Sequence, residues 1–372
     1  MALYKTLVKK VSISPEKKTK QKDYLPKGQL PIIDQGQQLI GGYSDNLDLK
    51  LSCNLPVIVF GDHTRAVKYI DFPFGAGADG IKVLEPAEGI YPKFLYYATQ
   101  YLVLLLEDRG YARHYQYIEK KELDIPSIPE QKRIVARIEE LFSELDNGVE
   151  TLRKTKQQLA VYRQSVLKDA FSHITEKKTI REMTSVVTSG SRGWAQYYSD
   201  HGARFVRIGK LTRDRIRIDQ SDIQFVDLPE GAEGKRTQLQ PNDVLVSITA
   251  DLGSIGLVPD DIGEAYVNQH IAMIRFLNPE QGEFMAWYLR SDYGQKDLLK
   301  NKRGGGKLGL GLDDIRDSRV PVVSDAKASK IVENIEARLS VCDSIEKTVD
   351  TALQQAEAMR QSILKQAFEG KL

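Results

Sequence analysis

Residues 129–171 read PEQKRIVARIEELFSELDNGVETLRKTKQQLAVYRQSVLKDAF, and this stretch decides the fold. Apolar residues recur in it every seven positions, with others three or four positions away, which is typical of a coiled-coil stripe. The stripe consists of Ile138, Leu145, Leu152, Leu159 and Val166, and the flanking seam of Ile134, Leu141 and Tyr162. A helix with one apolar seam must bury it, so the stretch predicts a partner helix.

The ends of this helix can also be predicted. Ser127 and Glu130 have the spacing of a capping box, and Pro129 stands in the first turn, where a missing N–H does no harm. A helix over residues 130–172 would be about 64 Å long at roughly 1.5 Å per residue. In its interior, Gly148 is the one residue that weakens a helix.

The partner helix is a second copy of the same stretch. Residues 134–171 align without a gap with residues 331–368, and the heptad recurs as Ile335, Cys342, Val349, Ala356 and Ile363. The identical positions are Arg163, Gln164, Ser165, Leu167, Lys168, Ala170 and Phe171, which recur as Arg360, Gln361, Ser362, Leu364, Lys365, Ala367 and Phe368. This likeness indicates an internal duplication. Two long helices could be merely a dimerisation rod, but the long segments before each helix favour a scaffold that holds two other modules.

Composition limits the class of protein. A chain of 372 residues with 41% hydrophobic and 28% charged residues is expected to fold into two or more domains. Two cysteines, Cys53 and Cys342, argue against a disulfide framework or a cysteine zinc site and suit the reducing cytoplasm. The N-terminus lacks the apolar core of a signal peptide, and the longest apolar run is too short to span a membrane. We therefore expect a cytoplasmic protein. A net charge of +2 neither favours nor excludes nucleic acid.

The segments before the two helices predict two diverged copies of one α/β domain. In the first, short strands are expected near residues 31–33, 56–60 and 66–70, with a helix over 94–106. In the second, the apolar run 244–248 takes the place of 57–60, and residues 269–271 correspond to 79–81. The predicted fold is α+β with an internal pseudo-twofold repeat. Its domains are residues 1–126 and 173–321, and its long helices are residues 127–172 and 322–372.

Motifs for catalysis are not supported by their context. Residues 75–80 match G-x-G-x-x-G, but a strand-like run follows where a dinucleotide site needs a helix N-terminus. An enzyme that uses this loop remains a minor alternative. There is no P-loop, and the histidines lack metal-ligand spacing. We therefore expect no catalytic, metal or cofactor site in this chain.

Basic residues cluster at matched places of the two domains. Residues 109–116, RGYARHYQ, and residues 300–307, KNKRGGGK, are basic loops with glycine, and basic residues recur every two to three positions over 204–217. Such side chains neutralise phosphates and read base edges, although a single charge run is usually a solvated surface. Two matched loops make nucleic-acid binding as strong an interpretation as an ordinary solvated surface. The candidate DNA-binding residues are His63, Arg65, Lys68, Arg109, Arg113, His114, Tyr115, Gln116, Arg192, Trp194, Lys210, Arg213, Lys300, Asn301, Lys302, Arg303 and Lys307.

Three stretches carry a resemblance to a known family. Residues 125–135, IPSIPEQKRIV, and 163–171, RQSVLKDAF, closely resemble the central conserved region of the DNA-specificity subunits of type I restriction-modification enzymes. Residues 360–372, RQSILKQAFEGKL, resemble the distal conserved region of that family. Around residues 320–327, VPVVSDAK, the second helix lacks the Pro-Glu-Gln of the first. That departure raises the question of whether both helices dock a partner equally well.

The resemblance implies a non-catalytic subunit with two target-recognition domains, each of which binds half of a bipartite DNA site. The helices, packed as an antiparallel coiled coil, would set the spacer and dock two methyltransferase subunits that carry S-adenosylmethionine. Motor-nuclease subunits that use ATP and Mg would join through those. The alternative is a coiled-coil adaptor that binds proteins and no DNA.

Overall fold

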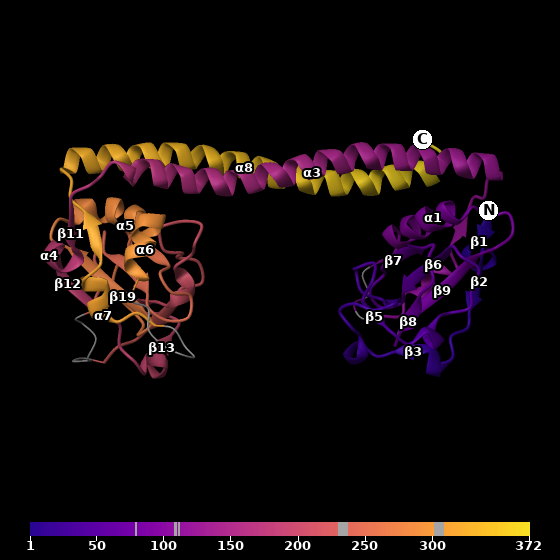
Figure 1. Ribbon diagram of the computed structural model, residues 1–372, viewed down its shortest axis with the longest axis horizontal. Coiled ribbons are helices and arrows are strands. Elements are labelled where there is room, and N and C mark those ends of the chain that lie inside the picture. Colours follow the sequence, from indigo (N-terminus) through magenta and orange to yellow (C-terminus); the bar gives the residue numbers. More distant parts are fainter. Residues whose placement is uncertain (79, 108–109, 111, 230–236, 301–308) are drawn as a thin grey trace. The chain divides into compact units, whose positions relative to one another are not determined.

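The structure, a computed structural model, describes residues 1–78, 80–107, 110, 112–229, 237–300 and 309–372. Its contacts divide the chain into two compact units (Figure 1). Unit 1 comprises Met1–Arg153 with Val349–Leu372, and unit 2 comprises Lys154–Thr348. Each unit combines one α/β domain with a segment of each of two long helices, α3 (Ile128–Ser172) and α8 (Asp325–Phe368).

In unit 1, an antiparallel sheet forms the centre of the domain. Its order is β2 (Val8–Val11), β9 (Ile81–Pro86), β6 (Val57–Gly61) and β7 (Val67–Ile70). Strand β6 is buried on both faces, which explains its unbroken apolar sequence. Ile58 and Phe60 pack against helix α1 (Pro92–Leu104), and Val57 and Val59 pack toward a second sheet. The predicted strands and helix of the first domain are thus present.

The second sheet of unit 1 contains the glycine motif. Its order is β3 (Lys18–Thr19), β8 (Gly75–Gly77), β4 (Leu30–Ile33) and β5 (Gly42–Ser44). A Cβ atom at Gly75 would collide with the side chain of Ile32, so close strand packing explains this glycine. The chain continues into strand β9 rather than a helix, as the sequence predicts. Short strands β1 (Ala2–Leu3) and β10 (Glu122–Leu123) pair nearby, and helix α2 spans Tyr115–Ile118.

Unit 2 repeats this topology. The sheet β12 (Thr184–Ser189), β19 (Ile271–Phe276), β16 (Val244–Ser247), β17 (Ile255–Leu257) has the order of β2, β9, β6, β7. In the other sheet, β14 (Ala203–Val206) lies between antiparallel β15 (Gln224–Val226) and parallel β18 (Ala265–Val267), as β4 lies between β5 and β8. Strand β13 (Tyr198–Ser199) extends it. The remaining elements are β11 (Lys177–Thr179) paired with β20 (Arg319–Pro321), α4 (Ile180–Met183), α5 (Gly282–Arg290), α6 (Asp292–Leu298) and α7 (Leu312–Arg316). The duplication predicted from the sequence is confirmed by this topology.

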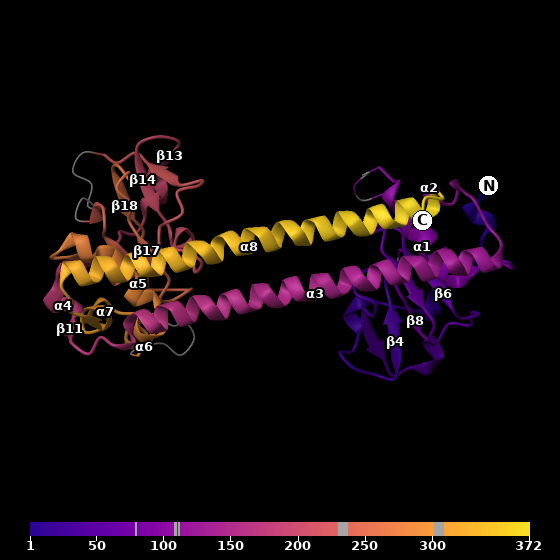
Figure 2. The ribbon, with the colours of Figure 1, turned by 90° about the horizontal axis from the view of Figure 1, so that it is seen from above.

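Within each unit, the segments of α3 and α8 lie side by side and run in opposite directions (Figure 2). In unit 2, Arg163 donates to Asp343 at 2.6 Å and Arg338 donates to Asp169 at 3.1 Å, so partner numbers fall along α8 as they rise along α3. In unit 1, Arg360 pairs with Asp146, and Ile138 shares a core with Ile363. The antiparallel pairing is therefore confirmed. None of the helices in the described ranges is both long and apolar enough to cross a membrane.

Two details differ from the sequence prediction. Tyr162, expected on the buried seam, is 42% exposed, because its ring lies against the guanidinium of Arg338 at 5.4 Å instead of in the apolar stripe. Glu130, expected to close a capping box with Ser127, pairs instead with Arg133 one turn along the same helix, at 2.7 Å. Helix α3 begins at Ile128.

The start of α3 is fixed by Gln131, the residue after Glu130. Its side chain is completely buried. Its amide oxygen accepts from the backbone N–H of Tyr91 at 2.8 Å, and its Nε2 donates to the carbonyls of Gly89 at 3.0 Å and Pro126 at 2.9 Å. All of these bonds are with backbone groups. The Gln of the Pro-Glu-Gln motif thus fastens the helix to the first domain.

At the start of α8 the roles of helix and domain are exchanged, because the amide side chain belongs to the domain. Gln281, in the second domain, donates from Nε2 to the carboxylate of Asp325 at 2.5 Å and to the carbonyl of Val323 at 3.2 Å. Asn278 donates to the same carboxylate at 2.8 Å. The amide that the second helix lacks is therefore supplied by its domain.

Candidate nucleic-acid interface

In unit 1, two loops meet at the end of the buried strand β6. Asp62, which is itself buried, accepts from the backbone N–H of Tyr115 at 2.8 Å through its carboxylate and from that of His114 at 2.8 Å through its carbonyl. Lys82 lies 3.4 Å from the same carboxylate. We call residues 61–66, 80–82 and 112–116 edge 1. It brings together predicted DNA-binding residues from segments about fifty positions apart in the sequence.

The loop after β6 holds a candidate arginine in a fixed turn. Arg65 has a φ of +61°, in the left-handed region of the backbone that residues other than glycine rarely adopt. Its N–H donates to the carbonyl of Gly61 at 2.8 Å, and Gly61 donates to Ala66 at 2.8 Å. Backbone strain of this kind persists where surrounding contacts impose it, and it is common at functional sites. His63 is half-buried in the same turn.

Of the other predicted residues in unit 1, two lie exposed on edge 1. Arg113 and Gln116 are exposed, and Gln116 donates from Nε2 to the carbonyl of Arg113 at 3.0 Å, which stiffens the segment between them. No ion pair holds the Arg113 side chain in the part of the chain that the structure describes. Arg109 lies outside the described residues. Arg113 and Gln116 are therefore the best placed of these candidates to contact a ligand.

Three other predictions in unit 1 require correction, because the side chains are buried. Lys68 donates to the carbonyl of Asp34 at 2.8 Å, and burial lowers the pKa of its ammonium group. Tyr115 packs on Phe60, with ring centroids 6.0 Å apart, and burial raises the pKa of its hydroxyl to about 12. The ring of His114 is also buried, with Nε2 3.3 Å from the carbonyl of Gly110. His114 and Tyr115 thus belong to the interior of edge 1, and Lys68 is occupied by Asp34.

Unit 2 has the equivalent edge at the end of strand β16. The N–H of Ile248 donates to the carbonyl of His270 at 2.9 Å, and the N–H of Leu310 donates to the carbonyl of Ile248 at 3.0 Å. Thr249 pairs with Gly309, and Ser191 pairs with Asn268, in isolated bridges. Four segments thus converge. We call residues 190–192, 248–254, 268–270 and 309–310 edge 2.

A chain of polar side chains runs across edge 2. The hydroxyl of Thr249 lies 2.8 Å from Nδ1 of His270, and Nε2 of His270 lies 3.0 Å from Nε2 of Gln269. All three side chains are half-buried. Sequence reasoning found the segment 269–271 as part of the repeat but did not select these residues. The available signal was the position of Gln269 and His270 directly before strand β19. The corresponding strand of the first domain, β9, directly follows the glycine motif.

The loop between β16 and β17 is held by Arg213. Its guanidinium donates to the carboxylate of Asp251 at 2.6 and 3.1 Å and to the carbonyl of Leu252 at 2.8 Å. Hydrogen bonds from Arg213 and then Ser254 lower the pKa of Asp251, so this carboxylate remains charged. Arg213, which the sequence predicts to contact DNA, is exposed, but its hydrogen-bonding groups already serve edge 2.

The row of basic residues over 204–217 is likewise occupied mainly within the domain. Arg204 donates to the carbonyls of Asp261 and Ile262, Lys210 donates to the carbonyl of Ser221, and Arg217 donates to Glu283 at 2.8 Å. These contacts occupy hydrogen-bond donors that the sequence alone suggests are free for a ligand. For Lys210 the structure therefore favours a role inside the domain over the predicted contact with DNA.

Trp194 is another correction, because it lies in the core of unit 2. The indole stacks on Phe205 with ring centroids 5.3 Å apart and meets Tyr266 edge-on at 5.3 Å. By contrast, Arg192 and Lys300 are exposed, and Arg192 belongs to edge 2. Asn301, Lys302, Arg303 and Lys307 lie outside the described residues. Arg192 and Lys300 therefore remain available for a ligand in unit 2.

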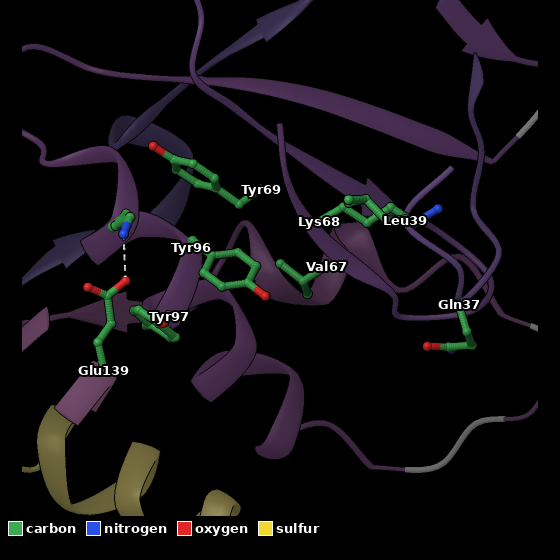
Figure 3. Close-up of a pocket in the computed structure, with 9 residues that line it drawn as sticks. Gln37, Leu39, Val67, Lys68, Tyr69, Tyr96, Tyr97 and Glu139 are labelled. Atoms are coloured by element: carbon green, nitrogen blue, oxygen red, sulfur yellow. Dashed lines mark hydrogen bonds and ion pairs between the residues drawn. The ribbon is translucent and has the colours of Figure 1, made fainter. Parts of the chain in front are cut away.

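Unit 1 also contains a hollow of about 340 Å³ beside α3 (Figure 3). Tyr69 and Tyr96 meet edge-on at 5.9 Å, and Lys93 and Glu139 form an ion pair of 2.7 Å at its side. Its lining residues are Gln37, Leu39, Val67, Lys68, Tyr69, Lys93, Tyr96, Tyr97 and Glu139. Aromatic lining of this kind is typical of surfaces that receive a side chain of a protein partner. Among the described residues, no group of three or more His, Cys, Asp or Glu side chains is arranged to hold a metal ion.

Comparison with known proteins accounts for this arrangement. A family model described as the type I restriction modification DNA specificity domain matches residues 10–159 and 202–355. The chain is 26% identical over 281 residues to the specificity subunit of the type I restriction enzyme EcoBI of Escherichia coli, a match that covers 67% of this chain and 58% of that relative. The chain thus spans little more than half the length of that relative.

Two further likenesses extend along more of the chain. The EcoR124I/EcoR124II specificity subunit of Escherichia coli is 27% identical over 345 residues, which is 88% of this chain and 83% of that protein. A solved structure that describes complex assembly and conformational transition of the type I R-M system contains a chain of the same fold, with a TM-score of 0.73 at 14% identity over 92% of both chains. Because the family model matches both halves of the repeat, the chain belongs to the type I restriction-modification DNA specificity subunits.

Proposed function

We propose that this chain selects the DNA sequence for a type I restriction-modification complex, with each domain binding one half of a bipartite, gapped site through its own edge. One observation carries the proposal. Edges 1 and 2 stand at the same place in the repeated topology, yet they are built from unlike side chains. In edge 1, Asp62 holds two loops together, whereas in edge 2 a chain of polar side chains runs through Thr249, His270 and Gln269. A duplicated scaffold with unlike edges suits a protein that reads two different half-sites.

The exposed cations supply the general attraction to DNA. Arg113 in edge 1, Arg192 in edge 2 and Lys300 beside it can each neutralise a phosphate. Gln116 can pair with a base edge. The predicted residues outside the described ranges, Arg109, Asn301, Lys302, Arg303 and Lys307, extend the same two loops and are part of this proposal.

The paired helices are proposed to dock two methyltransferase subunits. In unit 2, Val161 of α3 is 70% exposed and Val341 of α8 is 59% exposed. Val341 and Ile345 follow Arg338 along one face of α8, and Arg338 contacts the ring of Tyr162 on α3. We call Val161, Tyr162, Val341 and Ile345 the apolar strip. A hollow of about 510 Å³ lined by Val161 and Tyr162 lies along it.

The apolar strip fits a protein better than DNA, because the centres of protein interfaces are depleted of charge. We propose that a methyltransferase subunit covers it, and that the aromatic hollow of unit 1 serves the same kind of contact. S-adenosylmethionine is then held by the methyltransferase subunits, and ATP with Mg by motor-nuclease subunits joined through them. The present chain supplies sequence specificity without catalysis, in the cytoplasm.

A genome-wide map of methylated adenines tests the proposed function. The map is made in cells with the gene intact and in cells from which it is deleted. We expect one bipartite motif to lose its methylation on deletion. If no motif changes and the purified chain with its methyltransferase binds no DNA, the protein-adaptor hypothesis gains support instead.

A further inference from the structure

We infer that Gln269 reads an adenine in the half-site of the second domain, with His270 and Thr249 as positioning residues. The inference rests on the proposed function, since it assigns a base to one side chain of edge 2. It follows from the geometry of the turn before β19 and from the hydrogen-bonding groups that this geometry leaves free.

The turn that carries Gln269 is held firmly. The N–H of Asn268 donates to the carbonyl of Val206 at 3.2 Å, and the N–H of His270 donates to the side-chain oxygen of Asn268 at 3.2 Å. A Cβ atom at Gly190 would collide with the carbonyl of Asn268, so this glycine permits the segment before Arg192 to pack directly against the turn. Gln269 therefore projects from a backbone with little freedom.

The three side chains fix one another's orientation. An amide nitrogen can only donate, so the contact between Nε2 of Gln269 and Nε2 of His270 makes the imidazole nitrogen the acceptor. The proton of the neutral ring is then on Nδ1 and is donated to the hydroxyl of Thr249 at 2.8 Å. Thr249 is in turn held by its bridge to Gly309. The amide of Gln269 is thus kept in a single orientation.

In the part of the chain that the structure describes, this arrangement leaves one donor and one acceptor of the Gln269 amide free. One N–H of Gln269 is used by His270, and the second N–H and the amide oxygen have no partner among the residues that the structure describes. Adenine presents the complementary pair in the major groove, with N7 as acceptor and the N6 amino group as donor. Guanine presents two acceptors there, and the Gln oxygen would face one of them. The free groups therefore match adenine, and their fixed orientation favours selectivity over mere affinity.

The first domain does not contain this arrangement of hydrogen-bonded side chains. Gly80 occupies the position that corresponds to His270, so no ring is available there to orient a neighbouring amide. Gly80 has a φ of +75° and packs against the side chain of Gln35. Changes at Gln269 should therefore affect one half-site and leave the other intact.

The test uses the full chain in its own host, with the chromosomal gene replaced by variants and the methylated motif mapped. Gln269→Ala should lower methylation of the bipartite motif roughly ten- to a hundredfold and relax its sequence at one adenine position of the second half-site, while the sequence of the first half-site stays unchanged. Gln269→Glu should shift that position toward cytosine, whose amino group donates to a carboxylate. Gln220→Ala is the matched control, because Gln220 also donates its amide to a side chain, Asp261 at 3.2 Å, but outside edge 2.

The positioning role has its own readout. Thr249→Val removes the hydroxyl that holds His270, so it should relax the same adenine position with little change elsewhere, and Thr249→Ser should restore selectivity. A relaxed sequence in the first half-site, lower methylation without relaxation at any position of the second half-site, or an unchanged motif in Gln269→Ala would each overturn the inference. If the unaltered protein specifies no bipartite motif at all, it is the proposed function that fails.

Discussion

At the scale of single residues, the junction between the first domain and α3 depends on the buried amide of Gln131, which bonds to three backbone groups. We predict that Gln131→Ala lowers the free energy of unfolding of unit 1 by about 3 kcal/mol, because it leaves those groups buried without partners. Urea unfolding of the full chain measures this. Gln158→Ala, on the exposed face of the same helix, should change it by less than about 0.5 kcal/mol. Equal effects of the two changes would contradict this role.

A second residue-scale prediction concerns pH. Burial, and then the hydrogen bond with Glu336, raise the pKa of Glu283 to about 7, although Arg217 donates to it at 2.8 Å. A carboxyl group whose pKa is raised in the folded state holds its proton better there than in the unfolded chain. Unit 2 should therefore lose stability as pH rises from about 4.5 to about 7.

The variant Glu283→Gln keeps a neutral group at this position and should remove that part of the pH dependence. Thermal unfolding of both proteins at pH 5 and pH 8 gives the comparison. We expect the unaltered chain to lose more in Tm between the two pH values than the variant does. An identical loss in both proteins would show that Glu283 is not the group responsible.

Residue type alone misplaced several candidates. Lys68, Tyr115 and Trp194 look like DNA-binding residues in the sequence, but each is buried by groups distant in the chain, such as Asp34 below Lys68. Gln269 looks unremarkable because its orientation depends on Thr249, twenty positions away. Local sequence does not contain such partners. The heptads, by contrast, repeat within one helix, so both long helices could be predicted.

At the scale of elements, the apolar strip leads to a prediction about assembly. Val341→Asp, with its side chain 59% exposed, should leave folding unchanged but reduce methyltransferase binding more than tenfold, because a charge would be buried without a partner in the interface. Copurification followed by titration measures this. Ser340→Asp changes the adjacent exposed residue, which faces another direction on α8, and should have little effect. Similar losses in both variants would argue against the apolar strip as the docking surface.

Strands could be predicted from the sequence where both faces are buried. The loops at the strand ends, which form the candidate sites, could not. The sequence of β6 is apolar throughout because one face packs on α1 and the other on a sheet. The glycines at 75–77 resemble a nucleotide motif, but their spacing serves the packing of β8 on β4. What converges at the strand ends, edges 1 and 2, depends on long-range pairing that no local pattern encodes.

At the scale of the whole molecule, we propose that the paired helices act as a ruler that sets the length of the DNA spacer, and this predicts how the spacer responds to helix length. Inserting one heptad into both α3 and α8 adds about 10 Å, close to three base pairs, and also leaves the DNA out of rotational phase. Three heptads add about 31 Å, near one DNA turn of about 34–36 Å. We expect methylation to fall with one heptad and to recover with three, on a longer spacer and unchanged half-sites. Mapping the motif measures both; recovery on the original spacer would refute the ruler.

The two joints between domain and helix also bear on how such proteins change their targets. At the first joint, the hydrogen bonds of Gln131 use only backbone groups of the domain, while Phe94 and Tyr97 of the domain pack against the apolar residues of the helix. The second requires Gln281 and Asn278 of the domain to meet Asp325. By recombination, a first domain that keeps these apolar contacts could thus be exchanged without supplying an amide side chain to the start of the helix. A replacement for the second must bring its own amides, so the two halves of the site are not equally free to evolve.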